Sequence, residues 1–97
     1  SKANNLKQND GYITDSLGWA FYLTKNYEES EILLRQAIEL MPFDPIINDH
    51  YGDVLWRLNK KIQARYFWNH ALSLEQEDKK FIDSVGQKII FGLIEKS

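Results

Sequence analysis

Three glycines recur at an interval of 34 residues, at Gly18, Gly52 and Gly86. Other positions repeat at the same interval, with large apolar residues matched to large apolar ones and small residues to small ones. Such a period is typical of repeat proteins, in which units stack because no unit can bury its own apolar face. It predicts two stacked units and the start of a third. The matched columns are Leu17, Tyr51 and Val85; Phe21, Leu55 and Ile89; Ser30 and Ala64; Leu34 and Trp68; and Ala37 and Ala71.

Within each unit, apolar residues are spaced by three and four positions, which is the spacing of one face of a helix. Helix start signals accompany this spacing. Asp10 is a candidate cap, and Asn26 followed by Glu29 resembles a capping box. Asp44 is a further candidate cap, because it is followed by Pro45 and proline is favoured at the first position of a helix. The chain is therefore predicted to be all-α, with two antiparallel helix pairs and one extra helix. The expected ranges are about 10–25, 26–40, 44–58, 61–74 and 78–95.

The composition narrows the classes of function. A chain of 97 residues has room for one thin core, which excludes a barrel enzyme or a two-domain enzyme with a cleft. The formal charge of −2 provides no overall positive field for nucleic acid or anionic lipid. The absence of cysteine excludes disulfides, zinc–thiolate sites and thiol catalysis. We expect neither a signal peptide nor a membrane-spanning helix in this stretch of sequence.

The order of residues within each unit matches a known pattern. The first unit reads LGWAFY at 17–22 and YEES at 27–30, followed by Leu34, Ala37 and Pro42. The second reads YGDVLW at 51–56 and IQA at 62–64, followed by Trp68 and Ala71. These residues resemble the tetratricopeptide repeat, a helix–turn–helix unit. The chain departs from the pattern at Gln76, in place of the closing proline, and at Lys25 and Asn59, where a turn glycine is usual.

The resemblance implies a division of the chain. Residues 10–43 would form the first repeat, 44–77 the second, and 78–97 a half repeat that caps the solenoid. The polar segment 1–9 would be a linker or a remnant of an upstream repeat. The segments 15–20 and 44–53 are similar to the C-terminal end of long bacterial tetratricopeptide proteins, some of which are exported. The compartment is therefore left open between the cytoplasm and the bacterial cell envelope.

The repeat predicts two packing features, a close helix crossing at each glycine and a covering helix at the end. Gly18 and Gly52 are expected where the two helices of a pair cross closely. The last helix is expected to cover the final apolar face with one side and to turn the other to water. The covering residues would be Phe81, Ile82, Val85, Ile89, Leu93 and Ile94, and the residues turned to water would be Lys79, Lys80, Asp83, Gln87 and Lys88.

The resemblance also implies a concave groove lined by the first helix of each repeat. Aromatic residues beside carboxylates suit a peptide with apolar and basic residues. The alternative is that these aromatics pack against neighbouring helices. The candidate groove residues are Tyr12, Asp15, Trp19, Tyr22, Asp49, His50, Asp53, Trp56 and Arg57, with Ser16 and Leu23 in the first copy and Lys80, Asp83, Ser84, Gln87, Ile90 and Phe91 in the closing helix.

We expect a protein–protein interaction module, a scaffold or adaptor that binds a partner segment in this groove. The alternative is a structural C-terminal cap of a longer superhelix, which has no ligand of its own and forms a homodimer when isolated. Some tetratricopeptide domains bind acidic chaperone tails, but Asp15, Asp49 and Asp53 would repel such a tail. We expect no enzymatic activity, no cofactor and no nucleic-acid partner. His50 and His70 lack further ligands at metal-binding spacing, and His50 with Asp49 and Asp53 offers at most a weak site.

Overall fold

The computed structural model describes residues 2–93, and their side chains from residue 9 onward. This part of the chain contains five α-helices and no strand, as the sequence predicts. The helices are α1 (Lys2–Leu23), α2 (Tyr27–Leu40), α3 (Pro45–Arg57), α4 (Lys61–Leu74) and α5 (Lys79–Phe91).

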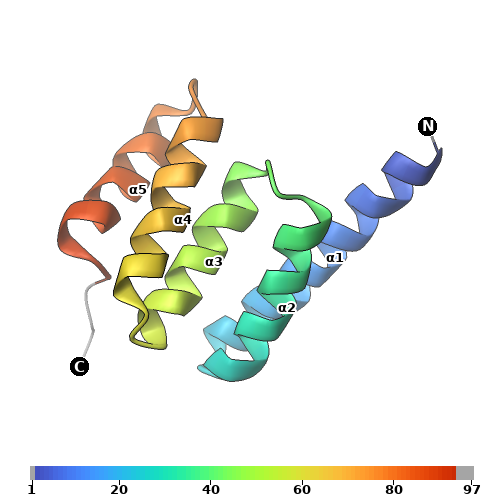
Figure 1. Ribbon diagram of the computed structural model, residues 1–97, viewed down its shortest axis with the longest axis horizontal. Coiled ribbons are helices and arrows are strands. Elements are labelled where there is room, and N and C mark those ends of the chain that lie inside the picture. The colour runs from blue at the N-terminus through green and yellow to red at the C-terminus, as the bar shows by residue number, and fades with distance from the viewer. Residues whose placement is uncertain (1, 94–97) are drawn as a thin grey trace.

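Each helix packs against the next one along the chain, and α1 also contacts α3. The helices lie in a row that runs from α1 and α2 at one end to α5 at the other (Figure 1). The core lies between them and joins residues from every helix after α1; its buried members are Leu34, Tyr51, Val54, Leu55, Ala64, Trp68 and Val85. Within residues 2–93, none of the helices combines the length and the apolar content that crossing a membrane requires.

Two predicted helix ends are wrong. The first helix starts at Lys2, so Asp10 lies inside it and is not its cap, and residues 2–9 are helical. These residues include no proline, and polar residues such as lysine and glutamine are compatible with a helix. The last helix ends at Phe91, because Gly92 adopts a φ of 73° that a helix cannot continue. The predicted end at Glu95 and the predicted cover residue Ile94 lie outside the described residues.

Of the other two predicted caps, one is confirmed and one is wrong. The Asp44 carboxylate accepts a hydrogen bond from the backbone N–H of Ile47 at 3.0 Å, which confirms the cap before Pro45. Asn26 precedes α2 but makes no side-chain cap bond. Its amide instead donates to the hydroxyl of Thr24 at 2.9 Å, within the preceding turn.

The turns inside the two helix pairs have the same hydrogen-bond pattern. The backbone N–H groups of Lys25 and Asn26 donate to Tyr22 and Phe21, and 34 residues later those of Asn59 and Lys60 donate to Trp56 and Leu55. This is the Schellman arrangement, which needs a left-handed residue after the helix. Lys25 and Asn59 adopt that conformation, with φ values of 66° and 65°. The unusual turn residues therefore preserve the turn.

The recurring glycines have two different surroundings. A Cβ atom on Gly18 would lie 2.9 Å from Cγ of Leu34, and one on Gly52 would clash with the ring of Trp68. Both therefore mark close crossings of a helix pair, as predicted. A Cβ atom on Gly86 would have none of the described atoms within 4 Å.

Candidate binding surface on α1, α3 and α5

Three flat side chains on α1 and α3 form a stack, which we call the aromatic ledge: Tyr22, Trp19 and His50. Trp19 and Tyr22 are three positions apart on α1 and share a face of the helix. The Trp19 ring lies 4.4 Å from that of Tyr22 and 4.0 Å from that of His50, with interplanar angles of 9° and 16°. All three side chains are only partly buried. The ledge is therefore a partly exposed stack of aromatic rings that joins α1 and α3.

Polar contacts hold the ledge in place from both ends. Oδ1 of Asp15 accepts a hydrogen bond from Nδ1 of His50 at 2.9 Å. Nε of Arg57 donates to the hydroxyl of Tyr22 at 3.3 Å. Burial raises the pKa of Tyr22, against the opposing effect of the Arg57 hydrogen bond. The structure thus brings five of the nine predicted groove residues into one network between α1 and α3.

We call the surface formed by the aromatic ledge on α1 and α3, together with Asp49 and Asp53 on α3, the α1–α3 wall. A lysine from α5 contacts the second part of this wall. Nζ of Lys88 lies 2.6 Å from Oδ1 of Asp49 and 2.8 Å from Oδ1 of Asp53. Asp53 also accepts a hydrogen bond from the indole N–H of the buried Trp68 at 2.9 Å. We call these four residues the Lys88 cluster. The prediction that Lys88 faces water is wrong, because two carboxylates on α3 draw its ammonium group inward.

The ionisation of this cluster is set by burial and by the shared cation. Burial, with repulsion from Asp49, raises the pKa of Asp53 to about 6, although Lys88 and Trp68 act in the opposite direction. Burial alone would lower the pKa of Lys88, but attraction by Asp53 and Asp49 outweighs it and raises the pKa. Asp49 and Asp53 therefore have an internal counter-ion.

Trp56 faces a different set of neighbours. Its ring lies 5.6 Å from that of Trp68, and the charged ends of Lys61 and Arg65 each lie 5.0 Å from its centroid. A Cβ atom on Gly92 would clash with the Trp56 ring, so the backbone after α5 crosses directly over it. Trp56 thus packs between α4 and the chain that follows α5, apart from the aromatic ledge.

The remaining predicted groove residues lie at the margins. Tyr12 is half exposed, and repulsion from the nearby Asp44 raises the pKa of its hydroxyl. The six closing-helix positions named above are all exposed on α5. Three of them, Ser84, Gln87 and Phe91, line a shallow hollow of about 250 Å³ together with Lys88, Gly92 and Leu93.

The sequence does contain a signal that would have identified Lys88 as a buried residue. One period earlier, its position is occupied by Val54, which is completely buried in the core. A lysine in place of a buried valine needs an anionic partner, because an unpaired buried charge is costly. Asp49 and Asp53 are the available carboxylates on the facing helix.

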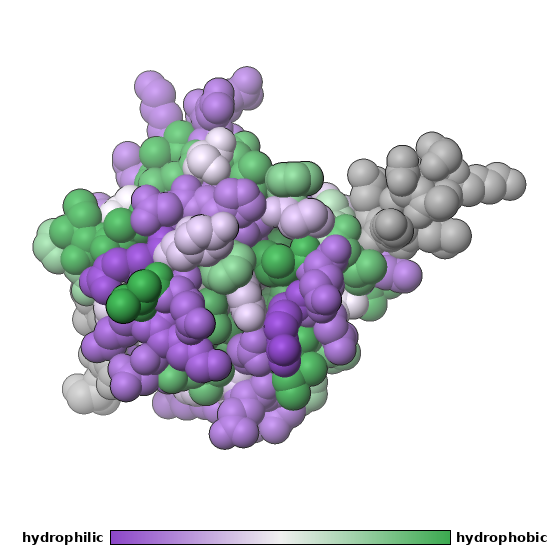
Figure 2. Space-filling model, viewed as in Figure 1, coloured by the Kyte–Doolittle hydropathy of each residue, from purple (hydrophilic) through white to green (hydrophobic). Residues whose placement is uncertain are grey.

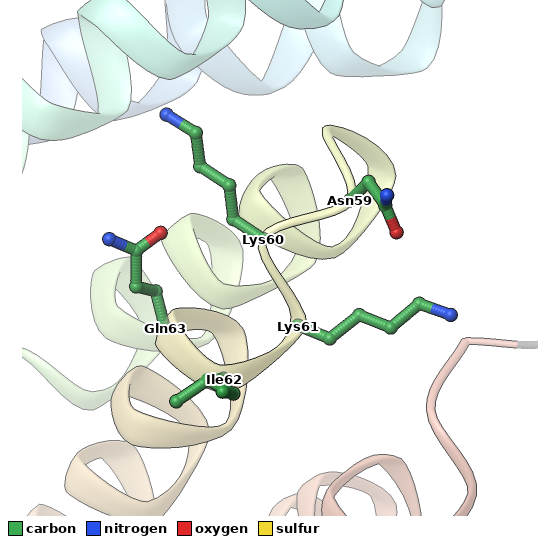
Figure 3. Close-up of a pocket in the computed structure, with 5 residues that line it drawn as sticks. All are labelled: Asn59, Lys60, Lys61, Ile62 and Gln63. Atoms are coloured by element: carbon green, nitrogen blue, oxygen red, sulfur yellow. The ribbon is translucent and has the colours of Figure 1, made fainter.

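A second depression, of about 480 Å³, lies at the turn between α3 and α4, with Asn59, Lys60, Lys61, Ile62 and Gln63 around it. Figure 3 shows these side chains pointing away from one another. They therefore do not converge on a ligand. His70 lies elsewhere, with Nδ1 2.9 Å from Oδ1 of the buried Asn48. Among the described residues, no three His, Asp or Glu side chains gather in a way that could hold a metal ion.

The fold and these contacts define the described chain as a compact all-α protein with an internal 34-residue repeat. Comparison with known proteins adds no family: no family model matches the chain, and no curated protein matches it.

Proposed function

We propose that this chain is a tetratricopeptide-type helical repeat and that it binds a segment of a partner protein against the α1–α3 wall. The observation that carries the proposal is the aromatic ledge, in which Trp19 is stacked between Tyr22 and His50 at 4.4 and 4.0 Å. Rigid aromatic surfaces that remain partly exposed are frequent anchors in protein interfaces.

The repeated turns and crossings support the repeat assignment. The same Schellman bonds recur after 34 residues, at Lys25 and at Asn59. The same close crossing recurs at Gly18 and Gly52. Each recurrence joins a sequence period to a three-dimensional feature, as expected for stacked copies of one unit.

The charges of the wall favour a largely apolar partner segment over a strongly basic one. Asp49 and Asp53 are already bound to Lys88, and Asp15 is bound to His50. A basic partner would have to compete with these contacts. Binding would therefore draw its free energy mainly from covering the ledge, at about 25 cal/mol per Å² before the costs of association.

Selection from a displayed library of random 12-residue peptides tests this proposal. The intact 97-residue chain is the target, and selected peptides are then measured against Trp19→Ala, Tyr22→Ala and a control, Tyr66→Ala. Tyr66 is an exposed aromatic residue on α4, away from the wall. The control therefore removes an aromatic side chain outside the proposed binding surface. We expect the two wall variants to bind about 5- to 150-fold more weakly, equivalent to ~1–3 kcal/mol.

Circular dichroism must show that each variant keeps its helices. The proposal is contradicted if no peptide is enriched, or if Trp19→Ala binds the selected peptides as tightly as Tyr66→Ala does.

A second candidate function is a structural cap for a longer superhelix. It is favoured by α5, which buries Val85 in the core and exposes Lys79, Lys80, Asp83 and Gln87. In that case the α1 end of the isolated 97-residue chain would pair with a second copy through apolar residues such as Ile13 and Leu17, which are at least half exposed. Light scattering at increasing concentration would detect such a homodimer, and Ile13→Asp would abolish it.

A further inference from the structure

Three residues four positions apart form a line along α5, which we call the α5 stripe: Ile82, Gly86 and Ile90. Residues at i, i+4 and i+8 lie on one face of a helix. One period earlier, the same positions in α3 are Asn48, Gly52 and Trp56. The structure shows what those three α3 residues do, so α3 is a template for α5.

All three α3 residues contact α4. Oδ1 of Asn48 lies 2.9 Å from Nδ1 of His70. Gly52 leaves just enough room for the ring of Trp68, and the Trp56 ring stacks on Trp68 at 5.6 Å. This face of α3 therefore packs against α4, the antiparallel second helix of the same pair.

The same face of α5 has no such helix among the described residues. No described atom lies within 4 Å of the position of a Cβ atom on Gly86, and the side chain of Ile90 is 70% exposed. Figure 1 shows α5 at the end of the row, and Figure 2 shows apolar side chains at the edge of the molecule where α5 lies. Among the described residues, the α5 stripe is thus largely uncovered at Gly86 and Ile90, whereas Ile82, which was expected to cover the core, is partly buried and is not one of the residues packed against the core.

The chain itself indicates the chemistry of the occupant. In both complete pairs, the seated helix presents a large apolar residue opposite the glycine, with a small residue four positions before it and an alanine three positions after it. These residues are Ser30, Leu34 and Ala37 in α2, and Ala64, Trp68 and Ala71 in α4, and all six are buried.

We propose that the α5 stripe binds an amphipathic helix of a partner protein, which crosses α5 at Gly86 and presents this small–large–alanine pattern. A second copy of this chain is a poorer occupant, because its two described helices with the pattern already have these residues buried. The proposed site is separate from the aromatic ledge, and neither proposal depends on the other.

A peptide with the sequence of α2 (27–40), end-capped and fluorescently labelled, serves as the probe, because it carries the pattern and enough charge to stay dissolved. Its anisotropy is measured against the intact chain. We expect saturable binding, weakened at least tenfold by Leu34→Asp in the peptide. In the chain, Gly86→Leu and Ile90→Asp should each weaken binding of the unmodified peptide at least tenfold. The leucine side chain of Gly86→Leu would occupy the space in which the peptide helix is proposed to cross α5. Because no described atom lies near a Cβ atom on Gly86, this substitution should leave the fold intact.

Ile62→Asp is the matched control, because Ile62 is an isoleucine on α4 that is 86% exposed. It should leave the affinity unchanged. The proposal is overturned if peptide binding does not saturate at millimolar concentration. It is also overturned if the Gly86→Leu variant binds the peptide with normal affinity, which would mean that the peptide replaces α2 in the α1–α2 pair. Sedimentation showing a dimer that Gly86→Leu dissociates would instead make a second copy the occupant.

Discussion

The ammonium nitrogen of Lys88 lies 2.8 Å from Oδ1 of Asp53, in a part of the chain where both side chains are largely buried. The contact joins α5 to α3, two helices separated in sequence by the whole of α4. It therefore fixes the position of the last helix by a charged contact in addition to the packing of Val85. Lys88 thereby gives a shared cation to Asp49 and Asp53, which the sequence alone presents as part of an acidic surface.

Replacing Lys88 with methionine should destabilise the protein by about 3 kcal/mol, because it leaves the buried Asp53 charge without its cation. Lys80→Met is the control, since Lys80 is exposed on the same helix, and its effect should stay within about 0.5 kcal/mol. Urea unfolding at pH 7 measures both. Adding Asp53→Asn to Lys88→Met should recover part of the loss; equal stability of the two single variants would contradict the prediction.

The stability contributed by Asp53 should fall as the pH rises from about 4 to about 6. Its pKa is about 6 in the folded protein and near 3.8 when unperturbed, so the folded state binds more protons in this window. The difference corresponds to at most about 3 kcal/mol. Lys88 stays charged throughout, because its pKa is raised from an already high value.

Other carboxylates change stability with pH too, so the measurement compares wild type with Asp53→Asn at pH 4, 5, 6 and 7. We expect the free energy of unfolding of the wild type to decline relative to that of the variant across this range. Parallel pH profiles would show that Asp53 titrates normally.

Alanine at the recurring glycines should have opposite effects at two matched positions. Gly52→Ala should cost about 1–3 kcal/mol, because the new methyl group meets Trp68, which is fully buried and held by Asp53. Gly86→Ala should stabilise the protein by about 0.5–1 kcal/mol, because the new methyl group meets no described atom and alanine favours the helix. Thermal unfolding measures both, and destabilisation by Gly86→Ala would mean that the site is covered.

Glycine at the two left-handed turn positions should stabilise the protein unequally. Lys25→Gly should raise the free energy of unfolding by about 1 kcal/mol, because a lysine at a φ of 66° is strained. Asn59→Gly should add less, because asparagine tolerates this conformation. Calorimetry would show a rise in Tm of about 4–8 °C for the first variant. A larger gain from Asn59→Gly would contradict this explanation.

Most of the helical architecture could be predicted from the sequence, because it depends on local patterns that recur. The 34-residue period, the helical spacing and the Asp44 cap identified five helices, and Gly18 and Gly52 identified two close crossings. The start of α1 was missed because Asp10 resembles a cap, although the residues before it are also able to form a helix. The left-handed conformation of Lys25 and Asn59, where a turn glycine is usual, was shown only by the structure.

The surroundings of the groove residues were decided by the tertiary structure. The sequence placed Asp49, Asp53 and Trp56 on one helix, but it did not determine which neighbouring helix each side chain meets. That depends on how each helix is rotated about its axis and where the chain runs after α5, and many packed side chains together set both. Lys88 therefore meets two carboxylates, and Gly92 covers Trp56, while Trp19, Tyr22 and His50 remain partly exposed.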